Sequence, residues 1–134
     1  MSDLILLDSS AWLIHLFQED GSEHITSYLE GNATKISIAS PSLVEVSSRL
    51  FSIGHGEKWS LFWETYIQIF DEIFPISTAV AQRAITIRQG TPTRLPTVDA
   101  LIAACASVCG ATLVHRDKHF LDIPTQLLSQ HYLT

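Results

Sequence analysis

Four acidic side chains stand at positions where a folded α/β protein could bring carboxylates together. Asp8 and Asp117 each follow a short apolar run typical of a buried strand. Glu45 and Asp99 each fall near the start of a segment with helical periodicity. In open parallel sheets, ligands bind at the carboxyl edge of the strands, and many of the following helices begin at the same edge. We therefore expect these carboxylates to converge there.

Carboxylates that converge in this way need a counter-charge. Two unit charges about 4 Å apart repel by about 4 kcal/mol at an effective dielectric constant of about 20. Such a cluster stays ionised only if a cation binds, and a set of oxygen ligands suits Mg²⁺ or Mn²⁺. A cation held in this way can activate water and stabilise the charge that develops on a phosphodiester under attack. The four acids therefore predict metal-dependent phosphodiester hydrolysis.

Three of the four acids also have a simpler structural explanation. Glu45 could form a capping box with Ser42, or a surface ion pair with Arg49 four residues later. Asp99 could lie in a first helical turn because the helix dipole favours an acid there. Asp117 could cap the turn that follows its strand. The case for a shared site depends on the combination of acids and on none of them alone.

The elements that must position these acids follow from the hydrophobic pattern. Short apolar runs alternate with amphipathic helical segments, which is typical of an α/β domain with a mainly parallel sheet and helices on both faces. The expected strands cover residues 4–7, 36–39, 73–76 and 111–114, with one further short strand in the tail after residue 121. The expected helices are one capped by Ser9 or Ser10 that carries Trp12 to Phe17, and others over residues 22–29, 40–53, 57–70, 77–89 and 96–109. We predict a single helix-rich domain over residues 1–134 with a sheet of four or five strands.

Composition narrows the class of protein. A hydrophobic content of 46% indicates a globular chain, and no apolar stretch approaches the ~18 residues of a membrane span. The start of the chain lacks the basic region of a signal peptide, so we expect a cytoplasmic protein with reduced Cys105 and Cys109. The net charge of −6 argues against a broad phosphate-binding surface. It allows a local basic rim, for which Arg94, Arg116 and Lys118 are the candidates.

Four short motifs follow one another along the chain. They are Leu-Leu-Asp-Ser-Ser at residues 6–10, Ser-Leu-Val-Glu-Val at residues 42–46, Leu-Pro-Thr-Val-Asp-Ala-Leu-Ile-Ala-Ala at residues 95–104, and Leu-Val-His-Arg-Asp-Lys-His-Phe at residues 113–120. In this order they resemble the motifs of PIN-domain ribonucleases, and they are most similar in length and spacing to the VapC toxins of toxin–antitoxin modules. The resemblance covers essentially the whole chain.

The resemblance implies a PIN-like three-layer α/β/α sandwich and an endoribonuclease that cuts single-stranded RNA. It implies that one or two Mg²⁺ or Mn²⁺ ions are held by Asp8, Glu45, Asp99 and Asp117. It further implies that Ser10 supports Asp8 by hydrogen bonding, and that an antitoxin protein blocks the site. One position departs from the family pattern: His115 stands where a small hydroxyl or amide residue is usual, two places before the last acid. This departure bears on the number of metal ions and on the orientation of Asp117.

Other functions fit the residues less well. His115 and His119 have the i, i+4 spacing of a helical zinc motif, but Arg116 replaces the glutamate that the zincin pattern requires after the first histidine. A phospho-receiver module needs an adjacent acid pair after its first strand, and an Asp-x-Asp phosphatase needs an acid at Ser10. A PIN nuclease of RNA processing that is not a toxin, and a PIN scaffold used only for binding, remain open alternatives.

Aromatic side chains are numerous for so small a domain. The residues concerned lie on two helical stripes, and most of them are expected in the core: Trp12, Leu16, Phe17, Trp59, Phe62, Trp63 and Tyr66. Because a small domain can hardly bury all of them, we expect some to form a homodimer face or a groove for an antitoxin peptide.

Overall fold

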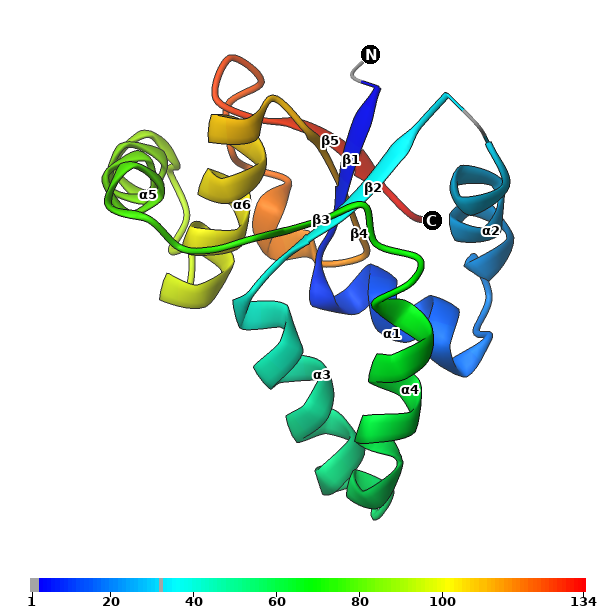
Figure 1. The fold of residues 1–134 in the computed structure, drawn as a ribbon. Helices are drawn as coiled ribbons and strands as arrows, with labels where there is room; N and C mark the ends of the chain where they lie inside the picture. The colour runs from blue at the N-terminus through cyan, green and yellow to red at the C-terminus, as the bar shows by residue number, and fades with distance from the viewer. Residues whose placement is uncertain (1–2, 32) are drawn as a thin grey trace.

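The sheet at the centre of the computed structural model is parallel throughout, with strand order β3-β2-β1-β4-β5 (Figure 1). The structure describes residues 3–31 and 33–134, and the element bounds below refer to these residues. The strands are β1 (Leu4–Leu7), β2 (Lys35–Ala39), β3 (Glu72–Phe74), β4 (Thr112–His115) and β5 (Ser129–Tyr132). The four predicted strands and the further strand in the tail are confirmed.

Helices cover both faces of this sheet, so the predicted three-layer sandwich is confirmed (Figure 1). They are α1 (Ser9–Phe17), α2 (Ser22–Glu30), α3 (Pro41–Ser52), α4 (Trp59–Tyr66), α5 (Thr78–Gly90) and α6 (Thr97–Cys109), with short 3₁₀ turns η1 (Gly56–Lys58) and η2 (Lys118–Phe120). Helices α5 and α6 pack on one face, and α1, α2 and α4 pack on the other. None of the helices in the described part of the chain is long and apolar enough to cross a bilayer.

Strand β1 is buried on both of its faces, as its unbroken apolar run predicts. Leu6 packs into the core beneath α5 and α6, whereas Ile5 and Leu7 pack into the core beneath α1 and α2. Each of these three side chains is at most 1% exposed. Because β1 lies between β2 and β4, the backbone at its carboxyl end is held from both sides. This strand is the rigid support for Asp8.

The helix predicted over residues 57–70 is wrong in length. Its first turn is η1, and α4 ends at Tyr66. The chain leaves the helix because Asp71 has to reach the sheet: its backbone N–H donates to the Ile36 carbonyl at 2.7 Å, and its side chain accepts from the Ile36 N–H at 2.8 Å. A helical pattern in the sequence carries no signal for this distant pairing.

Trp12 is fully buried in the core beneath α1 and α2, as the aromatic stripes predict. Its ring contacts four other aromatic rings, which are those of Trp59, Trp63, Tyr66 and Phe70. Other apolar side chains stay in solvent, among them Phe17, Phe51 and Leu61. Cys105 and Cys109 are free thiols.

Candidate metal centre

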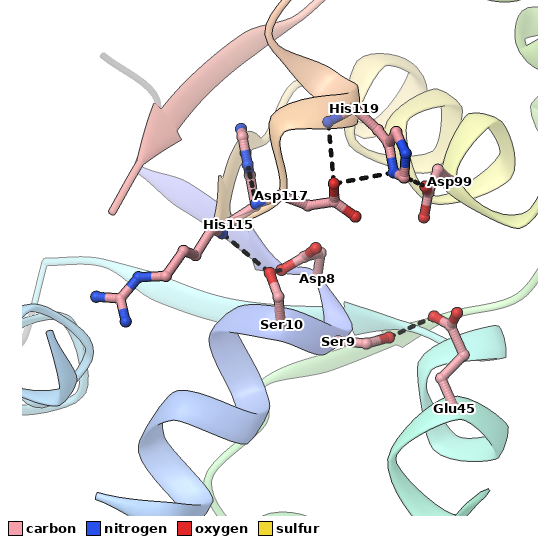
Figure 2. A network of polar contacts seen from close by, with 9 residues as sticks. Asp8, Ser9, Ser10, Glu45, Asp99, His115, Asp117 and His119 are labelled. Carbon is pink, nitrogen blue, oxygen red and sulfur yellow. Dashed lines mark hydrogen bonds and ion pairs between the residues drawn. The ribbon is translucent and has the colours of Figure 1, made fainter. Parts of the chain in front are cut away.

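The four predicted acids gather at the carboxyl edge of the sheet (Figure 2). Asp8 follows β1 and Asp117 follows the neighbouring strand β4, and the Asp8 N–H donates to the Val114 carbonyl at 3.1 Å. Glu45 comes from α3, which begins just after β2, and Asp99 comes from the first turn of α6. Strands and helices that are distant in sequence therefore deliver their carboxylates to one place.

Asp8 is the N-cap of α1, a role that the sequence assigned wrongly to Ser9 or Ser10. Its Oδ1 accepts from the Ala11 N–H at 2.9 Å and from the Ser10 hydroxyl at 2.7 Å. The hydrogen bond expected from Ser10 is thus present. The same Ser10 oxygen accepts from the Arg116 N–H at 2.9 Å, so it ties the end of β1 to the end of β4.

The carboxyl group of Asp8 is held in an unfavourable environment for a charge. The residue is 3% exposed. The pKa of Asp8 is raised to about 7: burial is the largest cause, the hydrogen bonds from Ala11 and Ser10 act against it, and the charges of Asp117 and Asp99 add to it. Both hydrogen bonds that Asp8 accepts within the described residues go to Oδ1. Its Oδ2 accepts no hydrogen bond from the described residues.

Asp99, Asp117 and His119 form the closest group in the site. His119 Nδ1 lies 3.0 Å from Asp117 Oδ1 and 3.2 Å from Asp99 Oδ2. The pKa of Asp99 is raised to about 6: burial is the largest cause, the charges of Asp117 and Glu45 add to it, and His119 acts against it. The sequence offered His119 as half of a zinc pair, and the preferred prediction was a turn or rim residue near phosphate. Its position two residues after an acid, in a turn rather than a strand, was the available signal.

Glu45 is held by a partner that the sequence did not indicate. The Ser9 hydroxyl donates to Glu45 Oε1 at 2.5 Å and lies 3.1 Å from the Ser42 hydroxyl. The suggested capping box is not formed, because Ser40 is the N-cap of α3 and its side chain makes no capping bond. Among the described residues Glu45 also makes no ion pair with Arg49. Glu45 therefore faces the first turn of α1, toward the site, and away from Arg49.

His115 lies fully buried at the end of β4, and it orients the turn that carries Asp117. Its Nδ1 accepts from the Asp117 N–H at 3.1 Å, and its Nε2 lies 2.8 Å from Gln130 Oε1. The Gln130 amide is itself oriented, since its Nε2 donates to the Phe120 carbonyl at 3.0 Å. These contacts require a neutral imidazole with its proton on Nε2. A zinc pair with His119 is not formed, because the two residues lie on a strand and a 3₁₀ turn.

Of the three expected basic residues, Arg116 is bound to the protein itself. Its Nε donates to the Leu133 carbonyl at 3.1 Å, and its Nη2 donates to the Asp20 carbonyl at 2.5 Å. Gly21, in the left-handed conformation with φ 101°, leaves room for this guanidinium, because a Cβ there would collide with it. Arg94 and Lys118 are exposed.

The residues present fit a divalent cation. Asp99, Asp117 and His119 each offer one ligand atom within 4.8 Å of the others, and Asp8 adds a buried carboxylate whose charge interacts with both aspartates. Buried carboxylates with raised pKa values, facing one another, are typical of sites completed by a bound ion.

The raised pKa of Asp8 predicts how stability depends on pH in the metal-free protein. Between about pH 4 and pH 7 the folded state keeps the Asp8 proton and the unfolded state releases it, so stability falls as pH rises through this range. Asp8→Asn removes the effect. By urea unfolding in a chelator, we expect this variant to match the wild type near pH 4 and to exceed it at about pH 8, by at most on the order of 4 kcal/mol. A difference that does not change with pH would contradict this account.

The contacts of His115 predict the effect of removing its partner. Gln130→Met leaves the buried Nε2–H without an acceptor, which costs about 1–3 kcal/mol of stability. We expect the ¹⁵N shifts of His115 to show the Nε2-protonated form in the wild type and a mixture of tautomers in the variant. Gln126→Met, at an exposed glutamine, is the matched control. An unchanged tautomer in Gln130→Met would show that Gln130 does not orient His115.

Comparisons with known proteins agree with this architecture. Chains of three solved structures share the fold. VapBC2 from Rickettsia felis bound to promoter DNA has a TM-score of 0.80 and 20% identity, and the match covers 98% of this chain and 99% of that chain. DNA-bound VapBC from Salmonella typhimurium has a TM-score of 0.74 and 20% identity over 100% of both chains, and a toxin–antitoxin complex from Klebsiella pneumoniae has a TM-score of 0.68 and 24% identity over 90% of this chain and 92% of that chain. No curated protein sequence matches the chain. The profile of the PIN domain matches residues 5–125. The chain belongs to the PIN domain family.

Proposed function

We propose that the protein is a divalent-metal-dependent endoribonuclease that hydrolyses single-stranded RNA and acts as the toxin of a toxin–antitoxin pair. One observation carries the proposal: four carboxylates from four different elements converge at the carboxyl edge of a PIN-domain sheet. The fold alone does not determine function, so the argument depends on the chemistry of these side chains.

Each group has a distinct part in the proposed site. Asp8, Asp99 and Asp117 hold Mg²⁺ or Mn²⁺, and the bound ion supplies water activation and stabilisation of the phosphodiester charge. Ser10 and the Ala11 N–H keep Asp8 oriented, and His115 keeps the Asp117 turn oriented. Glu45, held by Ser9, contributes the fourth carboxylate from the opposite side of the site.

RNA is proposed as the substrate because the site can accept an extended phosphodiester. The side chains of Asp117 and His119 are 31% and 55% exposed, so the acid cluster is accessible from solvent. The exposed Lys118 follows Asp117 directly and is the nearest candidate for a phosphate contact in the sequence, with Arg94 as a second one. With a net charge of −6, few phosphates can be contacted, so cleavage at a short single-stranded segment is favoured over binding along a duplex.

A protein partner is proposed from the neighbours and from the exposed apolar surface. The three solved neighbours are VapBC and toxin–antitoxin complexes. In this chain an apolar hollow of about 310 Å³ lies between the end of α1 and the α3–α4 region, lined by Phe17, Leu50, Ile53, His55, Lys58 and Phe62. Exposed apolar surface of this kind usually marks a binding face. We assign such faces to an antitoxin and to a second copy of the chain.

The catalytic proposal predicts that Asp8→Asn abolishes cleavage without unfolding the protein. Removing one cation ligand costs several kcal/mol of transition-state stabilisation, so we expect Mg²⁺- or Mn²⁺-dependent cleavage of single-stranded RNA to fall at least about 100-fold. Glu45→Gln should show a similar loss, while Asp122→Asn and Glu64→Gln, at exposed acids, should keep wild-type rates.

Growth of a bacterial host gives a second readout of the same variants. Induction of the wild type should arrest growth, and induction of Asp8→Asn should not. Undiminished cleavage by Asp8→Asn would contradict the mechanism. Cleavage without growth arrest would instead favour the PIN nuclease of RNA processing.

The partner proposal predicts that the chain does not exist as a free monomer. Light scattering of the purified protein should give about twice the 14.9 kDa mass of one chain. A soluble, monodisperse monomer would remove the case for both the homodimer and the antitoxin groove, because the apolar faces would then be stable in water.

A further inference from the structure

We propose that His119 is a nitrogen ligand of the bound cation, and that it makes the site select Mn²⁺ over Mg²⁺. This inference rests on the metal centre of the proposed function and adds a residue that the carboxylate set does not include. His119 lies outside the acids of the four motifs, at the turn that follows Asp117.

The spacing of the three donor atoms is that of ligands around one ion. Ligand atoms about 2.1 Å from an octahedrally coordinated cation lie about 3.0 Å from their neighbours. His119 Nδ1 lies 3.0 Å from Asp117 Oδ1 and 3.2 Å from Asp99 Oδ2, and all three groups offer atoms within 4.8 Å of one another. The imidazole nitrogen and the two carboxylates could therefore occupy one face of a coordination sphere.

The orientation of His119 is built into the fold, although the ring is half exposed. Its backbone N–H donates to Asp117 Oδ1 at 2.9 Å, and the next residue, Phe120, is fully buried beneath α6. These contacts fix the η2 turn on both sides of the imidazole. Figure 2 shows the His119 ring directed toward the carboxylates of Asp117 and Asp99.

The chemistry of the donor set distinguishes Mn²⁺ from Mg²⁺. Mg²⁺ prefers oxygen ligands and water and demands near-ideal octahedral geometry, whereas an imidazole suits transition metals. Mn²⁺ accepts both carboxylate and imidazole, so two aspartates and one histidine favour it over Mg²⁺. The competing explanation is that His119 only neutralises the two acids, in which case a cation would have to displace it.

Electron paramagnetic resonance of Mn²⁺ tests the inference directly. We expect the wild type at about pH 7.5 to show ¹⁴N coupling from a bound imidazole. His119→Ala should lose this coupling and bind Mn²⁺ at least about tenfold more weakly. Its Mg²⁺ affinity, from competition, should change much less. His119→Asp should keep Mn²⁺ binding without ¹⁴N coupling and should bind Mg²⁺ more tightly relative to Mn²⁺. His24→Ala, at an exposed histidine outside the site, is the matched control.

Two results would overturn the inference, and they can be distinguished. If the wild type binds Mn²⁺ without ¹⁴N coupling, or if His119→Ala binds Mn²⁺ as tightly or more tightly, His119 is not a ligand and the carboxylate centre still stands. If the wild type binds Mn²⁺ no more tightly than the Asp99→Asn variant does, the metal centre of the proposed function itself fails.

Discussion

Burial of negative charge at one edge of the sheet is the constraint on which the rest of the structure depends. Asp8 is almost inaccessible to water, and Asp99 and Asp117 lie close enough to raise its pKa further. Without a cation this arrangement favours protonated carboxyl groups, which cannot serve as metal ligands. The protein nevertheless orients each acid with a dedicated hydrogen-bond partner. These hydrogen bonds are explained if a bound ion compensates the negative charge of the carboxylates.

The scaffold holds the acids by different means at each position. Asp8 stands at the end of a strand that is paired on both sides and is fixed by the first turn of α1. Asp117 depends on a longer series of contacts, in which Phe120, Gln130 and His115 orient the backbone of its turn. The first arrangement is rigid by burial, whereas the second is rigid only while every polar partner is satisfied. The turn after β4 is therefore the more sensitive part of the site.

The sequence predicted the strands and the edge at which the acids meet, because both follow from local patterns. The apolar run before Asp8 and the helix start before Asp99 are signals that a few neighbouring residues carry. It did not predict the Ser9–Glu45 contact or the end of α4. Each of these depends on a partner more than thirty residues away, Ser9 for Glu45 and Ile36 for Asp71. Local periodicity has no access to such pairs.

His115 and His119 show the same limit at the site itself. Because His115 departs from the family pattern, the sequence left the orientation of Asp117 open. In the structure Gln130, on the edge strand β5, forms a hydrogen bond with His115 and so fixes the imidazole beside the Asp117 turn. The i, i+4 spacing of the two histidines suggested zinc. Because a turn follows β4, His115 instead contacts Gln130 and His119 contacts Asp99.

The central claim is that a divalent cation holds these carboxylates together, and crystals grown with Mn²⁺ test it most directly. Anomalous scattering locates manganese independently of any assumption about the protein. The account predicts an anomalous peak bounded by the carboxylates of Asp8, Asp99 and Asp117. Saturating Mn²⁺ with no peak among these side chains, or with a peak only elsewhere on the surface, would contradict it.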